Sequence, residues 1–305
     1  MAVAALEQAL GQVLRGKAEA VRLAVVCLLA RGHLLIEDVP GVGKTTLAHG
    51  LARAIDGQFQ RLQFTSDMLP SDVLGVTIYN AHSEEFEFKP GPIFTNFLLA
   101  DEINRTTPKT QSALLEAMNE GQVTVDGKPL ALPDPFMVVA TQNPAEHHGT
   151  YPLPESQLDR FLMRLRIGYP DAASEREILR QRSDERAGPV MNYQDLLKMQ
   201  ATVRQVIVND AVADYLLAIV KRTRNHEALE LGVSPRGSQA LYRSAQALAY
   251  LEGRTYAIPD DVKRLAVAVC GHRCVLRTKA SLNGSRSLQG DAIMRDILEH
   301  IEVPL

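Results

Sequence analysis

A glycine-rich loop between an apolar run and a helical pattern constrains the fold of this chain more than any other feature. Residues 33–37 read HLLIE, residues 38–45 read DVPGVGKT, and a helical segment rich in Ala and Leu continues through Ala54. In such a loop, backbone N–H groups wrap phosphates, the lysine reaches the outer phosphates, and the hydroxyl that follows holds magnesium. The start of the helix adds its partial positive charge to the anion site. The order of strand, loop and helix therefore predicts a triphosphate site at Lys44 and Thr45.

An alternative reading of the loop is a turn that only caps a helix. The full phosphate-loop pattern asks for glycine where this chain has Asp38, so the letters alone are weak support. The flanking strand and helix favour the phosphate loop. The residues that we expect to contact nucleotide are Pro40, Gly41, Val42, Gly43, Lys44, Thr45 and Thr46.

Two adjacent acids follow a second apolar run, residues 96–100. Asp101 and Glu102 end the sequence FLLADE, and adjacent side chains at the end of a strand point to opposite sides. One carboxylate can then serve a metal while the other takes a proton from the attacking water. We expect Asp101 to join Thr45 in holding Mg²⁺ and Glu102 to act as the general base. Surface acids after a strand are the alternative, which the phosphate loop earlier in the chain disfavours.

A third apolar run, residues 135–140, leads to Asn143 and Pro144. Strands that alternate with helices predict a mostly parallel sheet, in which ligands bind beyond the carboxyl ends of the strands. Asn143 would lie there between the loop and the acids, where it could orient water at the terminal phosphate. The alternative is an Asn that only forms a turn before Pro144.

Two segments interrupt this α/β pattern. Residues 76–92 alternate poorly, and residues 121–134 are expected to form a hairpin around Asp126-Gly127. Either segment could instead be a plain surface loop, with Phe86 and Phe88 packed against the sheet.

Helical patterns flank the α/β core on both sides. Residues 4–31 have apolar positions at helical spacing, with a break near Gly11 or Gly16. We expect a nucleotide-binding domain at 1–170 and an all-helical domain at 171–305, from which Arg236, at a helix start, could reach the nucleotide. The helical patterns of the second domain lie at 173–186, 193–203, 210–224, 238–252, 260–272 and 290–300.

Arg160 and Arg164 are spaced by four residues in LDRFLMR. Such spacing places both arginines on one face if the segment is helical. Charge that develops on a transferring phosphoryl group needs a cation, which an arginine of a neighbouring subunit can supply. The alternative is an ordinary solvated or ion-paired helix face.

Composition narrows the class of protein. The chain has 305 residues, 46% of them hydrophobic, and a formal net charge of -3. Proteins that bind the phosphate backbone of nucleic acids usually carry an excess of positive charge, which this chain lacks. It shows no apolar run near the ~20 residues that span a bilayer, no signal peptide, and too few cysteines for a disulfide framework, so a reducing cytoplasm is expected. Cys270, His272 and Cys274 lack a fourth ligand at zinc spacing, so we expect buried thiols.

Five motifs follow one another along the chain: DVPGVGKTTLA, FLLADEINR, ATQNP, LPESQLDRFLMR and SPRG. With them, the chain resembles the MoxR family of AAA+ ATPases from about residue 10 to its end. The resemblance implies a P-loop NTPase sheet flanked by helices and followed by an all-helical lid. Members of the family can carry Asp at the position of Asp38. The implied roles are Walker A for Lys44 and Thr45, Walker B for Asp101 and Glu102, sensor 1 for Asn143, sensor 2 for Arg236, the trans-acting finger for Arg160 and a second candidate finger in Arg164.

The resemblance also implies cofactors and partners. Members look like hexameric chaperone-type ATPases that use ATP and Mg²⁺ and cooperate with von Willebrand factor A domain proteins, often in inserting metal cofactors into clients. Residues 76–92 and 121–134 would be the helix-2 insert and the hairpin before sensor 1. Two alternatives stay open. One is a nucleic-acid motor, which the acids Glu84, Glu85 and Glu87 disfavour, and the other is a nucleotide-gated binding module with little turnover.

Overall fold

The structure is a computed structural model that describes residues 2–143, 149–180, 188–277 and 286–303. Residues 181–186 of the predicted helix 173–186, and Pro144 of the alternative turn, lie outside the described residues. No helix in the described part of the chain is long and apolar enough to cross a bilayer.

A five-stranded parallel sheet with the strand order β2-β5-β8-β1-β9 forms the centre of the molecule. The three predicted strands are present with slightly shifted bounds, whereas β2 and β9 were not predicted. The residues of β1 and β5 are all buried because helices cover both faces of the sheet. The strands are β1 (Leu34–Glu37), β2 (Phe59–Gln63), β5 (Phe97–Asp101), β8 (Met137–Gln142) and β9 (Met163–Leu165).

Alternate residues of the strands enter two different cores. Leu34 and Ile36 pack with apolar residues of α1 (Ala2–Val13), α2 (Ala18–Leu29) and α3 (Lys44–Ala54). On the other face, Leu35 packs with α4 (Pro70–Leu74) and α5 (Pro108–Glu120). The N-terminal helical region breaks at Gly16, whose φ of 68° suits glycine, while Gly11 lies inside α1.

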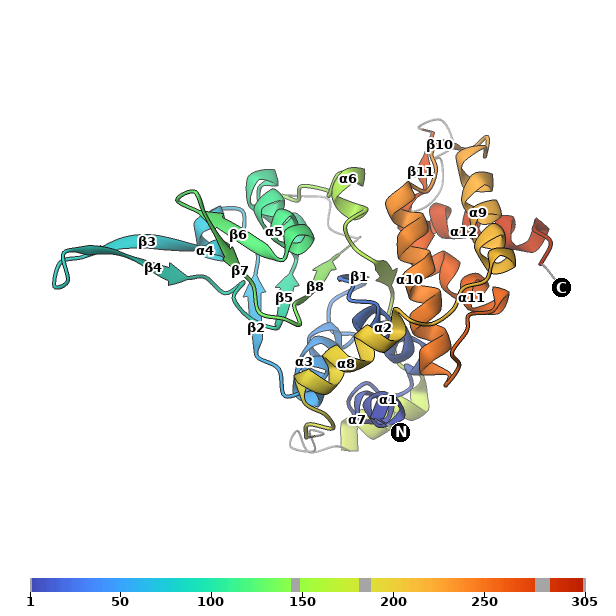
Figure 1. Ribbon diagram of the computed structural model, residues 1–305, viewed down its shortest axis with the longest axis horizontal. Helices are drawn as coiled ribbons and strands as arrows, with labels where there is room; N and C mark the ends of the chain where they lie inside the picture. The colour runs from blue at the N-terminus through green and yellow to red at the C-terminus, as the bar shows by residue number, and fades with distance from the viewer. Residues whose placement is uncertain (1, 144–148, 181–187, 278–285, 304–305) are drawn as a thin grey trace.

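The C-terminal part is mostly helical, and its described residues from 210 on lie at one end of the molecule (Figure 1). It also contains a short antiparallel pair, β10 (Leu229–Leu231) and β11 (Val275–Leu276), which the helical patterns did not predict. Gln200 in α8 donates from Nε2 to the Leu28 carbonyl of α2 at 2.7 Å, which ties this part to the core. The helices are α7 (Ala172–Arg180), α8 (Tyr193–Val203), α9 (Asp210–Arg224), α10 (Pro235–Leu251), α11 (Pro259–Cys270) and α12 (Arg286–His300).

Both inserted segments are hairpins. The first, β3 (Gly75–Asn80) and β4 (Glu85–Pro90), projects from the opposite end of the molecule (Figure 1). Phe86 on it is 75% exposed, so packing of Phe86 against the sheet is wrong, whereas Phe88 is partly buried beside Phe94.

The second hairpin, β6 (Gln122–Val125) and β7 (Lys128–Ala131), turns at the predicted Asp126-Gly127. Both turn residues have positive φ, 50° and 75°, as the tight turns that match strand twist require. Thr77 in β3 donates to the Asp126 carboxylate at 2.6 Å, so the two hairpins are in contact.

Stability should fall as the pH drops from 7 to 5, in part because of His33. Its ring accepts from the Val138 N–H and hydrogen-bonds the Met118 carbonyl, and burial lowers the pKa of His33 to about 4. The unfolded chain takes up a proton near pH 6.5, so below that pH the unfolded state binds more protons and gains relative stability. We expect His33→Gln to remove about 2 kcal/mol of this pH dependence, measured as unfolding free energies in urea at pH 7 and pH 5. An unchanged pH dependence in the variant would contradict the buried neutral ring.

Candidate active site

The glycine-rich loop joins β1 to α3 with two residues in left-handed conformations. Gly41 and Gly43 have φ of 85° and 99°, and Gly43 is the N-cap of α3, which no side chain caps. The N-terminal amides of an uncapped helix are a ready anion site. Lys44 lies at the start of α3, where its Nζ donates to the Asp38 carbonyl at 2.7 Å, and the side chain of Thr45 is exposed. The loop therefore presents the amide, ammonium and hydroxyl groups that a phosphate chain with Mg²⁺ requires.

Asp38 has a structural task at the position where the phosphate-loop pattern asks for glycine. Its buried carboxylate accepts the N–H groups of Val39 at 2.8 Å, Ile167 at 2.7 Å and Gly168 at 2.6 Å. Hydrogen bonds to an ionised acceptor are stronger than those between neutral groups. The departure from the pattern thus anchors the loop to the chain that leaves β9.

The two acids at the end of β5 are held by one hydroxyl. Thr141 in β8, fully buried, donates its Oγ1 hydrogen to Asp101 Oδ1 at 2.6 Å and accepts the Glu102 N–H at 2.9 Å. Glu102 has a φ of 57°, a left-handed conformation that is uncommon for a residue with a side chain. Strained backbone of this kind occurs often at functional sites.

The two carboxylates contact different partners. Asp101 Oδ2 lies 2.7 Å from Arg61 Nη2, and Glu102 Oε2 lies 3.1 Å from Arg105 Nη1. The side chain of Arg61 is half exposed, so it has room to move away from Asp101. Sequence reasoning missed Thr141, Arg61 and Arg105. Of these three residues, only Thr141 could have been found from the sequence, because it places a hydroxyl near the end of an apolar strand.

Asn143 directly follows β8 and is buried. In the sheet, β8 lies between β5, which ends in Asp101, and β1, which leads into the loop. The Asp38 N–H donates to the Gln142 carbonyl at 3.3 Å, so the loop and the end of β8 are joined by a hydrogen bond. The structure therefore places Asn143 at the strand edge between the loop and the acids.

The arginines at 160 and 164 do not share a helical face, because the segment that contains them is not helical. Helix α6 (Glu155–Leu158) ends before Arg160, and Arg164 lies in β9. Arg164 is 7% exposed, with Nη2 at 2.5 Å from Asp291 Oδ1 and Nη1 at 3.4 Å from Glu37 Oε2. Arg164 is thus held in a buried ion-pair network of its own chain, which favours Arg160 over Arg164 for the proposed finger.

Arg160 lies in the turn between α6 and β9 and is partly buried. Its Nε has no hydrogen-bond partner among the described residues. Arg236 is exposed at the start of α10, two residues after Ser234. Ser234 caps α10 and also donates to the Asp159 carboxylate at 2.9 Å. The start of α10 therefore contacts the residue that precedes Arg160.

The cysteines near the C-terminus are buried thiols, as expected. Burial raises the pKa of Cys270 to about 12, and that of Cys274 is raised further, so both stay protonated. The described residues contain no group of three His, Cys, Asp or Glu side chains that could hold a metal ion.

Comparison with known proteins agrees with this geometry. The sequence model of the "ATPase family associated with various cellular activities (AAA)" matches residues 33–163, and the model of the AAA lid domain matches residues 221–297. The chain belongs to the AAA ATPase family. The AAA match contains the loop, the acid pair, Asn143 and Arg160, and the lid match contains Arg236.

Relatives of this AAA ATPase extend over nearly its whole length. It is 51% identical to the Bacillus subtilis protein YeaC, over 97% of this chain and 93% of that protein. It is 40% identical to Chaperone MoxR1 of Mycobacterium tuberculosis, over 98% of this chain and 82% of that protein. A crystal structure of a Cytophaga hutchinsonii protein, 36% identical, superposes with a TM-score of 0.90 over 100% of this chain and 95% of that one. The resemblance to the MoxR family and the AAA fold with a helical lid are confirmed.

Proposed function

We propose that this MoxR-type AAA ATPase binds ATP with Mg²⁺ and hydrolyses it. The observation that carries the proposal is the joining of two motifs by hydrogen bonds across neighbouring strands. Asp38 bonds to Gln142 at the end of β8, and Thr141 of the same strand holds Asp101 and Glu102. The phosphate loop and the acid pair thus face one edge of the sheet, where parallel α/β sheets bind their ligands.

Each residue has a distinct task in this proposal. The N–H groups of residues 41–46 and the ammonium of Lys44 bind the phosphates, and the Thr45 hydroxyl and Asp101 hold Mg²⁺. Bound Mg²⁺ offsets the charge of the phosphate oxygens. Glu102 accepts the proton of the attacking water, and Asn143 orients that water. Arg236 approaches the nucleotide from the lid.

We further propose that the site is completed between subunits of a ring, hexameric as in the family it resembles. Arg160 is the proposed finger of this assembly, and the family match that contains it supports this assignment. The relative named Chaperone MoxR1 supports work on protein clients. A von Willebrand factor A domain protein is the proposed partner, and insertion of a metal cofactor into an enzyme is the proposed outcome.

Purified protein tests this function directly. We expect saturable ATP binding, release of phosphate that requires Mg²⁺, and a mass shift to a ring when ATP is added. Lys44→Ala should lose binding and turnover together because the lysine contacts the outer phosphates. Binding without turnover would select the nucleotide-gated module, and stimulation by DNA that weakens as salt rises would select the nucleic-acid motor. Absence of any affinity for adenine nucleotides would overturn the proposal.

Thr141→Val should lower kcat for ATP by about 10-fold or more, because positioning of both acids depends on the hydroxyl. Valine has a similar shape but offers no acceptor to the Glu102 N–H and no donor to Asp101, so stability should also fall by about 1–3 kcal/mol. Thr141→Ser retains the hydroxyl and serves as the matched control. Steady-state phosphate release and thermal unfolding measure the two effects, and a valine variant with wild-type kcat would refute this positioning role.

A further inference from the structure

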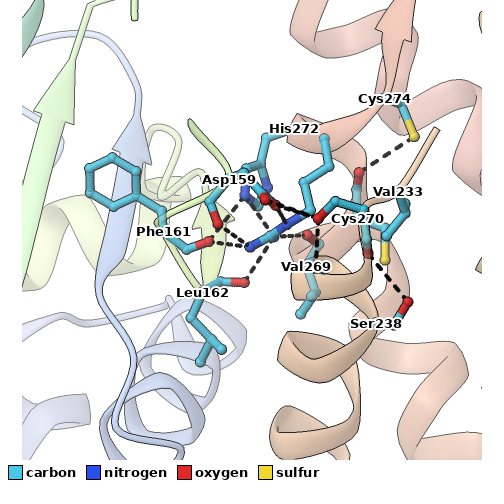
Figure 2. A network of polar contacts seen from close by, with 12 residues as sticks. Asp159, Phe161, Leu162, Val233, Ser238, Val269, Cys270, His272 and Cys274 are labelled. Atoms are coloured by element: carbon cyan, nitrogen blue, oxygen red, sulfur yellow. Dashed lines mark hydrogen bonds and ion pairs between the residues drawn. The ribbon is translucent and has the colours of Figure 1, made fainter. Parts of the chain in front are cut away.

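A buried arginine of the lid holds the segment that carries Arg160. Arg273 ends the short helix η2 (Gly271–Arg273), and its side chain is 2% exposed. Its guanidinium donates to Asp159 Oδ1 at 2.7 Å and to the carbonyls of Phe161 at 2.6 Å and Leu162 at 3.2 Å. Figure 2 shows Phe161 and Leu162 on one side of this network and Val269 and Cys270 on the other. The residues on both sides of Arg160 are therefore attached to the lid.

Asp159 receives a second bond from the lid, at the start of α10. Ser234 Oγ donates to Asp159 Oδ2 at 2.9 Å and accepts the Gly237 N–H at 3.0 Å, so one hydroxyl both caps the helix and contacts Asp159. A Cβ atom at Gly237 would lie 2.7 Å from Arg273 Cδ, which means that α10 begins directly against Arg273. Movement of the start of α10 therefore acts on Asp159 through two contacts.

The chemistry of these contacts makes the connection stiff. Asp159 accepts from a guanidinium and a hydroxyl, and hydrogen bonds to an ionised carboxylate are about twice as strong as neutral ones. Arg273 is buried, so breaking one of its bonds would leave a desolvated charge without compensation. The lid and the turn at 159–162 should accordingly move as one unit.

We propose that Asp159 is a positioning residue that couples the lid of one subunit to the Arg160 which that subunit offers to its neighbour. Arg236, proposed to approach the subunit's own nucleotide, lies two residues after Ser234, which bonds to Asp159. Arg160, proposed to serve the next site, directly follows Asp159. The Asp159 carboxylate therefore connects the segments that carry the two arginines. ATP bound in one subunit would then set the position of the finger at the next subunit. The inference rests on the proposed function of Arg160 in trans.

Mixed rings test the coupling. In rings of Asp159→Asn alone, kcat should fall on the order of 10- to 100-fold because Arg160 is displaced, while nucleotide affinity of isolated subunits stays at the wild-type value. Glu102→Gln subunits bind ATP but do not hydrolyse it, and they retain an intact Asp159 and Arg160. When they are mixed in equal amounts with Asp159→Asn subunits, the rate per Asp159→Asn subunit should recover to about half of the wild-type rate, since random neighbours share each site. A subunit that was merely unstable would gain nothing from an inactive neighbour.

Two controls keep the outcomes distinct. Arg160→Ala mixed with Glu102→Gln reports on the shared site itself. Recovery there without recovery for Asp159→Asn would overturn the coupling alone. No recovery in either mixture would overturn the trans role as well. Asp261→Asn removes the carboxylate of another buried pair in the lid, with Arg254 at 2.6 Å, and should lower stability without lowering kcat. If Asp159→Asn does not fold, Ser234→Ala removes one of the two contacts and should show the same recovery. Wild-type kcat in folded Asp159→Asn rings would also refute the proposal.

Discussion

Glu102→Gln should lower the turnover of ATP by about 1,000-fold while ATP remains bound in the ring. Glutamine has nearly the same size and can keep a hydrogen bond with Arg105, which lies 3.1 Å from Glu102 Oε2. It cannot accept a proton from water, so binding is preserved and only the chemical step is lost. Single-turnover phosphate release measures the rate, and mass measurement with ATP detects the ring.

The matched control for this variant is Glu116→Gln, on the exposed side of α5, which should turn over ATP at the wild-type rate. Loss of ATP binding in Glu102→Gln would mean that Glu102 supports the site structurally. Turnover at the wild-type rate would remove Glu102 from the role of general base.

Arg160→Ala should lower kcat on the order of 1,000-fold or more without changing the nucleotide affinity of an isolated subunit. In the proposed ring, the arginine acts on the neighbour's site, where it stabilises charge on the transferring phosphoryl group. Nucleotide titration of monomeric protein and steady-state turnover of rings separate the two quantities. Equal mixing with Glu102→Gln should restore part of the activity, because each variant supplies the half that the other lacks.

Arg222→Ala, an exposed arginine of α9, is the control for loss of a surface charge and should retain activity. Arg164→Ala provides the contrast predicted by the structure. It leaves Glu37 and Asp291 with one cationic partner fewer in a buried position, so its main effect should be a loss of stability. If Arg160→Ala weakens nucleotide binding in the monomer, the arginine acts in cis.

The central strands and the second hairpin could be predicted from sequence because local patterns determine them. β1, β5 and β8 are continuous apolar runs, buried on both faces, and Asp126-Gly127 meets the positive φ that its turn requires. β2 escaped prediction because FQRLQ has only two partly buried apolar residues, and β9 because three residues carry no readable period. A pattern is informative only where burial repeats along it.

The arginines show where spacing fails. A separation of four residues is the same whether the chain is a helix or a turn followed by a strand, so LDRFLMR could not reveal that Arg164 would enter β9. Its burial depends on Asp291, 127 residues away in α12. Asp38 presents the same difficulty, because its partners Ile167 and Gly168 lie well over 100 residues later.

The sequence by itself determined the kinds of groups at the site and their order along the chain: a phosphate loop, an acid pair, Asn143, Arg160 and Arg236. The groups and their order can be predicted because a few neighbouring residues determine where a strand ends and where a helix starts. Only the tertiary structure decided which groups hold them, namely Thr141 for the acids, Asp38 for the loop and Arg273 for the segment around Arg160. Hydrogen bonds between distant segments depend on how sheet and lid pack, and packing leaves no local period in the sequence.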